Sequence, residues 1–160
     1  MKVSKILLGL IIILSFKTSL SGQKQKCNNF QKSKYCYIPD SYDFKQYGRS
    51  RSALLKINQV YEYEAVLTAH KDFKIGVCAE PGYDPVKFRV IEKESGKVIY
   101  DNSTDDYNEN IGFSVEDQPL TVTIEVTVLA TKVKPTDIGD DRTCAGIQIL
   151  YKRIGKEGYN

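Results

Sequence analysis

The stretch 97–129 is the part of the chain around which the rest is expected to be organised. Within it, every second residue from Leu120 onward is apolar: Leu120, Val122, Ile124, Val126 and Val128. The residues between them are Thr or Glu. A period of two places the apolar side chains on one face of a β-strand and the polar ones on the other. The pattern predicts a long strand with one face in a core and one face in water.

Shorter alternating segments predict further strands at 49–57, 60–69, 73–79, 86–93, 97–101, 111–116 and 143–153. Residues 35–38 are a candidate for an additional edge strand. Gly, Pro and Asp turns separate the segments, and none has a sustained helical period of 3.6. We therefore expect an all-β fold, an antiparallel β-sandwich of jelly-roll-like form with about eight strands, in one domain.

The first residues predict the compartment. Lys2 and Lys5 precede an apolar run at 6–16 and a small polar segment at 18–22, which is the pattern of a secretory signal peptide. The run is shorter than the roughly 18 residues of a membrane span. We expect a signal peptide at 1–22 and an exported mature chain without a membrane span, located in the periplasm, at the cell surface or outside the cell.

The remainder divides into three parts. Residues 23–48 form a Tyr-rich arm, 49–153 the β-sandwich domain and 154–160 a tail. The whole chain has 23 basic and 20 acidic residues. Three of the bases lie in 1–22, which contains no acid, so the mature chain is formally neutral. This balance gives no argument for a nucleic-acid partner.

Four cysteines in an exported chain predict two disulfides. Cys78 lies out of phase with the apolar face of its strand, and Cys144 does the same in the last strand. This shared phase predicts a Cys78–Cys144 bond and leaves Cys27–Cys36 as a short local loop. A metal site is the alternative, but the spacings contain no CxxC element and the chain has one His.

The strand segments carry a family resemblance. YEYEAVL at 61–67, DFKIGVCAE from 72, FRVIEKESGKVIYDNSTDD from 88 and LTVTIEV from 120 resemble the strand order of the pre-peptidase C-terminal type of bacterial β-sandwich. SRSALL, FKIGVC, IYDNSTDDY and CAGIQI resemble a family of small exported bacterial proteins without an assigned activity. The resemblance covers 50–152 and implies an exported β-sandwich. The acidic pair expected at the start of the strand at Phe88 is absent.

The densest group of carboxylates lies at 101–110. It comprises Asp101, Asp105, Asp106 and Glu109. Clustered oxygen ligands suit Ca²⁺, which accepts six to eight of them, although the spacing is not that of an EF-hand loop. A solvated loop between two strands is the alternative. No cofactor other than Ca²⁺ is indicated by the sequence. Asp137, Asp140 and Asp141 form a weaker second cluster, and Asn102 begins a formal glycosylation sequon.

Tyrosines supply the candidate ligand-binding residues. The arm contains Tyr35 and Tyr37, together with Tyr42 and Tyr47, and such a group can serve as a recognition surface. The alternative is that these rings cover one end of the core. Outside the arm, Tyr83 and Tyr107 lie near turns and could stack on a sugar. Tyr100 is expected to cap the core.

Catalysis is not predicted. His70, the single histidine, ends a strand on its solvent face and is expected to be a surface residue, and no serine lies in a Gly-x-Ser-x-Gly motif. We expect a non-catalytic binding or structural protein of the bacterial envelope or extracellular space, with an envelope protein or a glycan as partner. The alternatives are a Ca²⁺-assisted carbohydrate- or peptide-binding module, an accessory subunit of an outer-membrane secretion, adhesion or motility assembly, and a small hydrolase.

Overall fold

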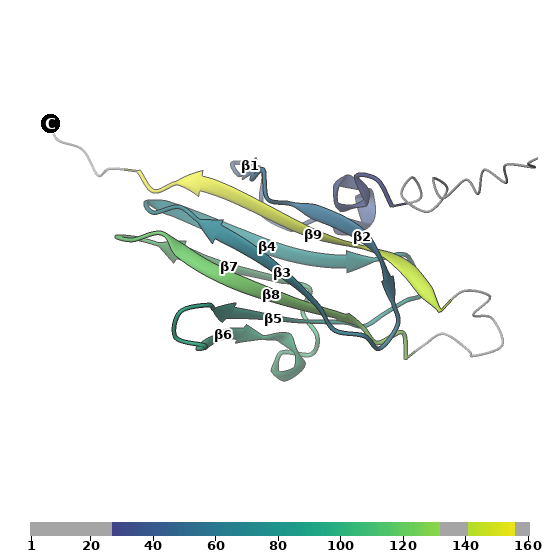
Figure 1. Ribbon diagram of the computed structural model, residues 1–160. Helices are drawn as coiled ribbons and strands as arrows, with labels where there is room; N and C mark the ends of the chain where they lie inside the picture. Colours follow the sequence, from purple (N-terminus) through teal and green to yellow (C-terminus); the bar gives the residue numbers. More distant parts are fainter. Residues whose placement is uncertain (1–26, 132–140, 156–160) are drawn as a thin grey trace, which may run out of the picture.

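The computed structural model describes residues 27–131 and 141–155. They form two antiparallel sheets that face each other as a sandwich (Figure 1). Sheet A contains β1 (Lys45–Gln46), β2 (Arg51–Lys56), β9 (Arg142–Arg153), β4 (Lys71–Ala79) and β7 (Asn110–Val115). Sheet B contains β3 (Tyr61–Leu67), β8 (Leu120–Val128), β5 (Val86–Glu92) and β6 (Val98–Asp101). The predicted all-β sandwich is confirmed.

The helical elements of the described residues are three short 3₁₀ turns, η1 (Phe30–Lys32), η2 (Lys34–Cys36) and η3 (Asn102–Thr104). No helix in this part of the chain is long and apolar enough to cross a membrane. The expected signal peptide at 1–22, Asp137, Asp140 and most of the tail lie outside the described residues.

The core lies between the two sheets. On β8, Val122, Ile124, Val126 and Val128 are almost completely buried, as the alternating pattern predicts. β3 and β5 pair with the two sides of β8. Phe73 of β4 and Phe88 of β5 add the largest buried side chains. The stretch 97–129 therefore supplies the central strand of sheet B. In sheet A the corresponding strand is β9, which pairs with β1, β2 and β4.

The short strand β1, which the sequence pattern misses, shares β9 with β2. Between β1 and β2, the Ser50 hydroxyl takes the place of a backbone partner for β9. It donates to the Ile149 carbonyl oxygen at 3.2 Å and accepts from the Ile149 N–H at 2.9 Å. Ser50 is buried, so these bonds satisfy β9 where its partner strand is interrupted.

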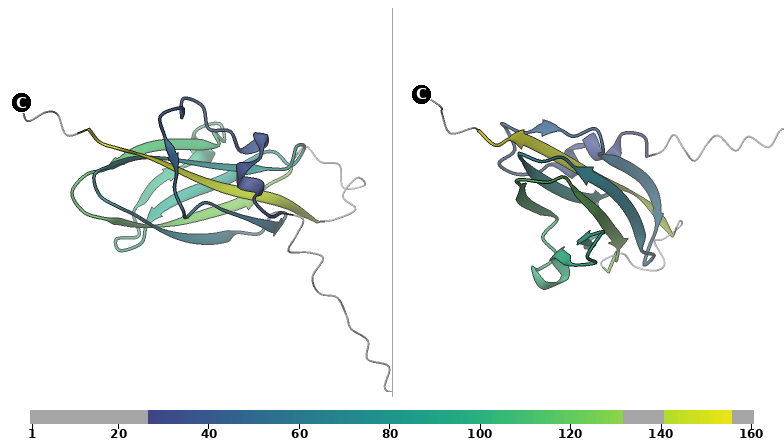
Figure 2. Two further views of the ribbon diagram at one scale, coloured as in Figure 1. Left: turned by 90° about the horizontal axis from the view of Figure 1, so that it is seen from above. Right: turned by 60° about the vertical axis from the view of Figure 1, so that its left-hand side comes forward.

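The arm differs from its prediction. Residues 35–38 are not an edge strand: the segment begins within η2 and ends in a buried Ile38. Ile38 packs directly over Gly76 of β4, where the absence of a side chain leaves room for it. The part of the arm before β1 thus lies on the outer face of sheet A, and the strands beneath it pair with one another. Figure 2 shows it crossing in front of β9.

Candidate functional site

Two disulfides fix the arm to sheet A. The predicted pairing is wrong: Cys27 is bonded to Cys144 and Cys36 to Cys78. The phase argument placed Cys78 and Cys144 correctly on the outer face of neighbouring strands, since Cys78 pairs with Gly146 in the register of β4 and β9. Each of these two cysteines bonds to a cysteine of the arm that lies above it. The arm is therefore held at two points.

The contact between arm and sheet is close at Gly146. A Cβ atom at this position would lie 2.8 Å from the Cα of Gln31 and 2.9 Å from the Cys78 Sγ. The Ser52 hydroxyl of β2 also donates to the Cys27 carbonyl oxygen at 2.7 Å. Gln31, a residue of the arm, is itself buried. These contacts and the two disulfides hold the arm as a defined surface of the domain.

The arm directs three tyrosines outward. The exposed fractions of Tyr35, Tyr37 and Tyr42 are 47%, 73% and 96%. Tyr47, the fourth tyrosine of the group, turns inward instead: its hydroxyl donates to the Val66 carbonyl oxygen at 2.8 Å and its ring meets Phe73 edge-on. Tyr47 therefore covers the core, as one of the two interpretations states, and the other three rings are exposed to solvent.

Tyr42 lies at a groove of about 450 Å³ on the outer face of sheet A. The groove is bounded by the loop 40–44 on one side and by outward residues of β4 and β7 on the other. The Lys74 ammonium donates to the carbonyl oxygens of Pro39 and Asp40 at 2.8 and 2.7 Å, which ties the loop to β4. Tyr42 is thus presented from a loop that is bonded to the sheet.

Phe44 is the second anchor of this loop. Its ring lies between two ammonium groups, with Lys74 Nζ 5.3 Å and Lys152 Nζ 5.1 Å from the ring centroid. Such cation–π contacts are attractive at exposed sites, though weaker than in a desolvated one. Lys152 also bonds to the Asp43 carboxylate at 3.1 Å, and this hydrogen bond raises the pKa of the ammonium. The contacts of both lysines therefore fix the loop.

The groove offers hydrogen-bond donors and acceptors side by side. Asp72 accepts from the Ser114 hydroxyl at 2.6 Å across the β4–β7 pair, and Gly112, which pairs with Lys74 in the same register, also lines the groove. The same strand phase that places Cys78 on the outer face also places Asp72 and Lys74 there. The sequence pattern therefore contained the signal for this groove, but it could not bring the loop 40–44 to it.

The acidic loop is built around Asn102. This side chain is fully buried: its Oδ1 accepts from the Phe88 N–H at 2.8 Å, and its Nδ2 donates to the carbonyl oxygens of Val86 and Asn108 at 2.9 and 3.2 Å. Every polar atom of the amide is bonded within the protein. Asn102 is thus a structural residue of the folded domain, and its amide is not accessible as a glycosylation acceptor.

The carboxylates of this loop engage separate partners. Asp101 accepts from the side chain and N–H of Ser103, which lowers the pKa of Asp101, and it forms an ion pair with Arg89 at 3.3 Å. Asp105 accepts from the Tyr100 hydroxyl at 2.6 Å. Burial and this bond raise the pKa of Tyr100, whose ring packs on Phe88 as the core-capping prediction requires.

Asp106 and Glu109, the remaining two acids of the predicted metal group, have different environments. Asp106 is exposed, whereas burial and the nearby Asp84 carboxylate raise the pKa of Glu109. Within residues 27–131 and 141–155, no group of three or more His, Cys, Asp or Glu side chains is arranged to hold a metal ion. Asp101, Asp105, Asp106 and Glu109 are not brought together as the calcium hypothesis requires.

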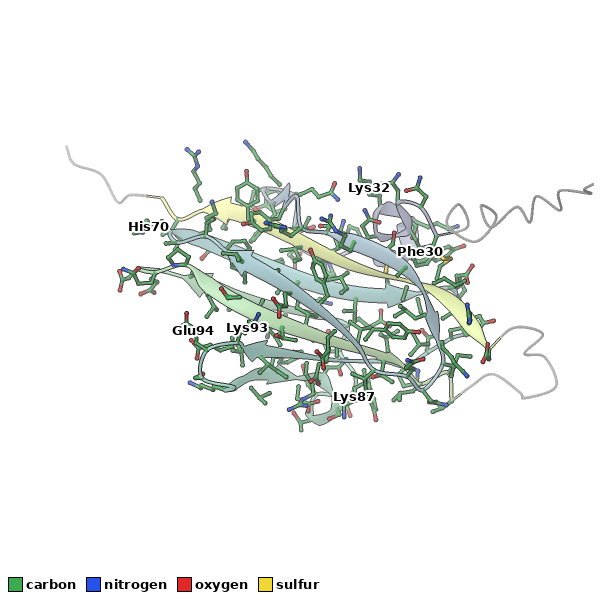
Figure 3. The ribbon with its side chains drawn as sticks, in the orientation of Figure 1. Phe30, Lys32, His70, Lys87, Lys93 and Glu94 are labelled. Carbon is green, nitrogen blue, oxygen red and sulfur yellow. A yellow bond between two sulfur atoms is a disulfide. The ribbon has the colours of Figure 1, made fainter. Side chains whose placement is uncertain are left out.

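The other predicted site residues are scattered over the domain. Tyr83 packs in part against the core, and Tyr107 is half-exposed in the acidic loop; neither lines the groove beside Tyr42. His70 is exposed in the turn between β3 and β4, at one end of the sandwich (Figure 3), as its surface prediction states. Asp141 forms an ion pair with Lys56 at 3.2 Å.

No protein-family model and no curated protein matches the sequence, so the resemblance to the pre-peptidase C-terminal type receives no support from them. Among solved structures, the chain is similar to PliG of Aeromonas hydrophila, a periplasmic inhibitor of g-type lysozyme. The identity is 10%, the match covers 64% of this chain and 84% of that one, and the TM-score is 0.44. A de novo designed double-stranded β-helix matches at 17% identity over 65% of this chain and 99% of that one, with a TM-score of 0.32. At these TM-scores neither protein informs the function of this chain.

Proposed function

We propose that this protein is an exported, non-catalytic binding protein, and that its recognition surface consists of Tyr35, Tyr37, Tyr42 and the adjoining groove. The observation that carries the proposal is the 96% exposure of Tyr42 on a loop fixed by Lys74 and Phe44. An exposed aromatic ring on an immobilised segment loses little conformational entropy when it binds, and tyrosines are common anchors of protein interfaces.

Export is supported by the cysteines. All four are bonded in pairs that hold the arm to the sheet, and such structural disulfides persist in oxidising compartments. A role without catalysis is supported by the same bonds, since the thiols are not available as nucleophiles. His70 lies in an exposed turn and does not line the groove.

The partner that suits the three tyrosines is an envelope or extracellular protein. Their rings are spread along the arm instead of lining one pocket, and an extended set of aromatic contacts matches a broad protein surface. An accessory subunit of an envelope assembly would use the arm in this way.

Affinity capture from envelope extract tests this proposal. We would compare the wild-type protein, the variant with Tyr35→Ser, Tyr37→Ser and Tyr42→Ser, and a control with Val60→Ser and Val98→Ser. The control removes two exposed apolar side chains outside the arm. We expect a partner that the wild type and control retain and that the arm variant retains at least about tenfold less, since interface anchors contribute about 2 kcal/mol or more each. Equal retention by the arm variant would exclude the arm as the recognition surface.

A short glycan is the second candidate, favoured by the groove alone. Tyr42 offers a ring face for stacking. The Asp72 carboxylate can accept hydrogen bonds, the Lys152 ammonium can donate them and the Ser114 hydroxyl can do both, which suits a neutral ligand rich in hydroxyl groups. Titration with soluble envelope polysaccharide distinguishes a glycan ligand from a protein partner. Saturable binding that Tyr42→Ser abolishes, and that Tyr35→Ser with Tyr37→Ser leaves unchanged, would assign the groove to a glycan.

A further inference from the structure

A second cavity opens at the edge of the sandwich between β2 and β3. Its volume is about 140 Å³ and its walls are mostly apolar: Ala53 and Leu55 of β2, Tyr61 and Tyr63 of β3, and Ala145 and Ile147 of β9. We call it the edge slot. Its physical cause is the register of sheet A, which pairs Ala53 with Ala145. Two neighbouring alanines face the space between the sheets and leave it unfilled, and Ala53 is exposed although it faces inward.

Two tyrosine hydroxyls join the sheets on either side of the edge slot. Tyr63 donates to the Arg49 carbonyl oxygen at 2.7 Å, and the Lys56 N–H donates to the Tyr61 hydroxyl at 3.0 Å. These bonds fix the separation of β2 from β3 at both ends of the slot. The opening is therefore held by the fold and is not closed by movement of β3 toward β2.

The backbone of β2 beside the slot is available for pairing. In an antiparallel strand, successive residues direct their N–H and C=O groups to opposite sides. The Lys56 N–H donates to Tyr61 and therefore points away from β9. Because Ser52 and Leu54 share the phase of Lys56, their N–H groups also point away from β9, to the free edge of sheet A. Within the described part of the chain, no group bonds to the backbone of Ser52 or Leu54 on that side.

The edge of β2 also lacks the usual protection against pairing. Natural edge strands are shielded by charged side chains, and β3 has Glu62 and Glu64 exposed along its length. The central residues of β2, from Ser52 to Leu55, carry no charge. Arg51 and Glu62 flank the slot, and among the described residues neither forms an ion pair.

We propose that the edge slot binds an extended peptide segment of a partner protein, which adds as a strand to the free edge of β2 and inserts one apolar side chain between the sheets. The Ser52 and Leu54 backbone supplies the hydrogen bonds, and alternate side chains of such an added strand point into the domain. A cavity of about 150 Å³ with apolar walls accommodates one benzene ring, so the slot takes a side chain of the size of Phe or Leu. Arg51 and Glu62 select an acidic and a basic residue beside it.

The probe is a phage-displayed library of nine-residue peptides, selected against the full exported chain with both disulfides formed. We expect enriched peptides with one Phe, Leu or Ile flanked by charged residues. Ala53→Leu fills the slot and should weaken the selected peptides at least tenfold without lowering the unfolding midpoint. The control Thr127→Leu introduces the same leucine side chain on the outer face of β8 and should leave their affinity within twofold.

A second measurement distinguishes strand addition from simple insertion of a side chain. N-methylation of the peptide nitrogens that face β2 should weaken binding at least tenfold, whereas methylation of the intervening nitrogens should have less than a twofold effect. An equal effect of both sets would overturn the proposal, as would a selection that enriches no sequence or peptides that bind Ala53→Leu as well as wild type.

The edge slot and the arm are tested independently. The variant with Tyr35→Ser, Tyr37→Ser and Tyr42→Ser should bind the selected peptides as the wild type does. Loss of peptide binding in this variant would place the peptide on the arm and contradict the slot assignment. Failure of the arm in the envelope capture, with peptide binding intact, would contradict the proposed function and leave the slot standing.

Discussion

Gln31 lies directly above Gly146, so close that a Cβ atom on Gly146 would be 2.8 Å from the Gln31 Cα. The atom in conflict belongs to a backbone, and it cannot move aside as a flexible side chain can. We predict that Gly146→Ala lowers the free energy of unfolding by about 1–3 kcal/mol, as overpacking does, and increases proteolysis of the arm. Gly112→Ala is the matched control, because its new Cβ would have only ordinary contacts at 3.7 and 3.8 Å. Urea unfolding should place the control within about 0.5 kcal/mol of wild type; equal losses in both variants would refute the contact.

The connectivity of the disulfides predicts a specific peptide map. Digestion without reduction should release one linked fragment containing Cys27 and Cys144 and another containing Cys36 and Cys78. The bonds close segments with sequence separations of 117 and 42 residues, which correspond to about 5 and 4 kcal/mol in the chain-entropy estimate. A fragment that links Cys27 to Cys36 would show that the arm is not fixed to the sheet. The tyrosine surface would then lose its support.

Asn102 connects the acidic loop to β5 through a buried amide. We predict that Asn102→Ala lowers the free energy of unfolding by about 2–4 kcal/mol, because the substitution leaves the Phe88 N–H and the Val86 carbonyl oxygen buried without their partner. Asn28→Ala, at an exposed asparagine of the arm, is the control and should be close to neutral. Chemical denaturation measures both. A neutral Asn102→Ala would mean that water can replace the amide in this position.

The pKa of Glu109 gives a prediction for pH dependence. Burial and Asp84 raise this pKa in the folded state above its unfolded value, so the folded protein binds the proton more strongly than the unfolded chain. The contribution of Glu109 to stability is therefore present below pH 4.5 and is lost as the pH rises through the folded pKa. Glu109→Gln should match the wild type in acid and be more stable at pH 7.

Thermal unfolding of Glu109→Gln over a pH series checks this sign. Glu94→Gln, at an exposed carboxylate in the turn between β5 and β6 (Figure 3), serves as the control and should not change the pH profile. Asp84→Asn should act in the same direction as Glu109→Gln and more weakly, because burial of Glu109 is the larger cause of the shift. A Glu109→Gln protein that is less stable at pH 7 would refute the assignment.

The groove, the disulfides and the acidic loop could be predicted from the sequence to different degrees. The phase of β4 places Cys78 on the outer face, and the same phase applies to Asp72 and Lys74 of the groove, because these side chains depend only on the alternation of one strand. The disulfide pairing did not follow from phase, since phase says which face a cysteine occupies and not which segment covers that face. For the acidic loop, composition left calcium and a solvated loop as alternatives, because it does not show that Asn102 organises the backbone and that Asp101 and Asp105 bond to separate partners.

The sequence by itself determined the strands β2 to β9, the inward face of the clearly alternating ones and the sandwich class, because alternation of apolar and polar residues acts locally and selects one face for burial. Tertiary structure alone decided which cysteines bond, how Tyr42 differs from Tyr47, and that Ala53 lies beside Ala145 to open the edge slot. Each of these depends on the register and packing of segments distant in the chain, for which short-range periodicity carries no information.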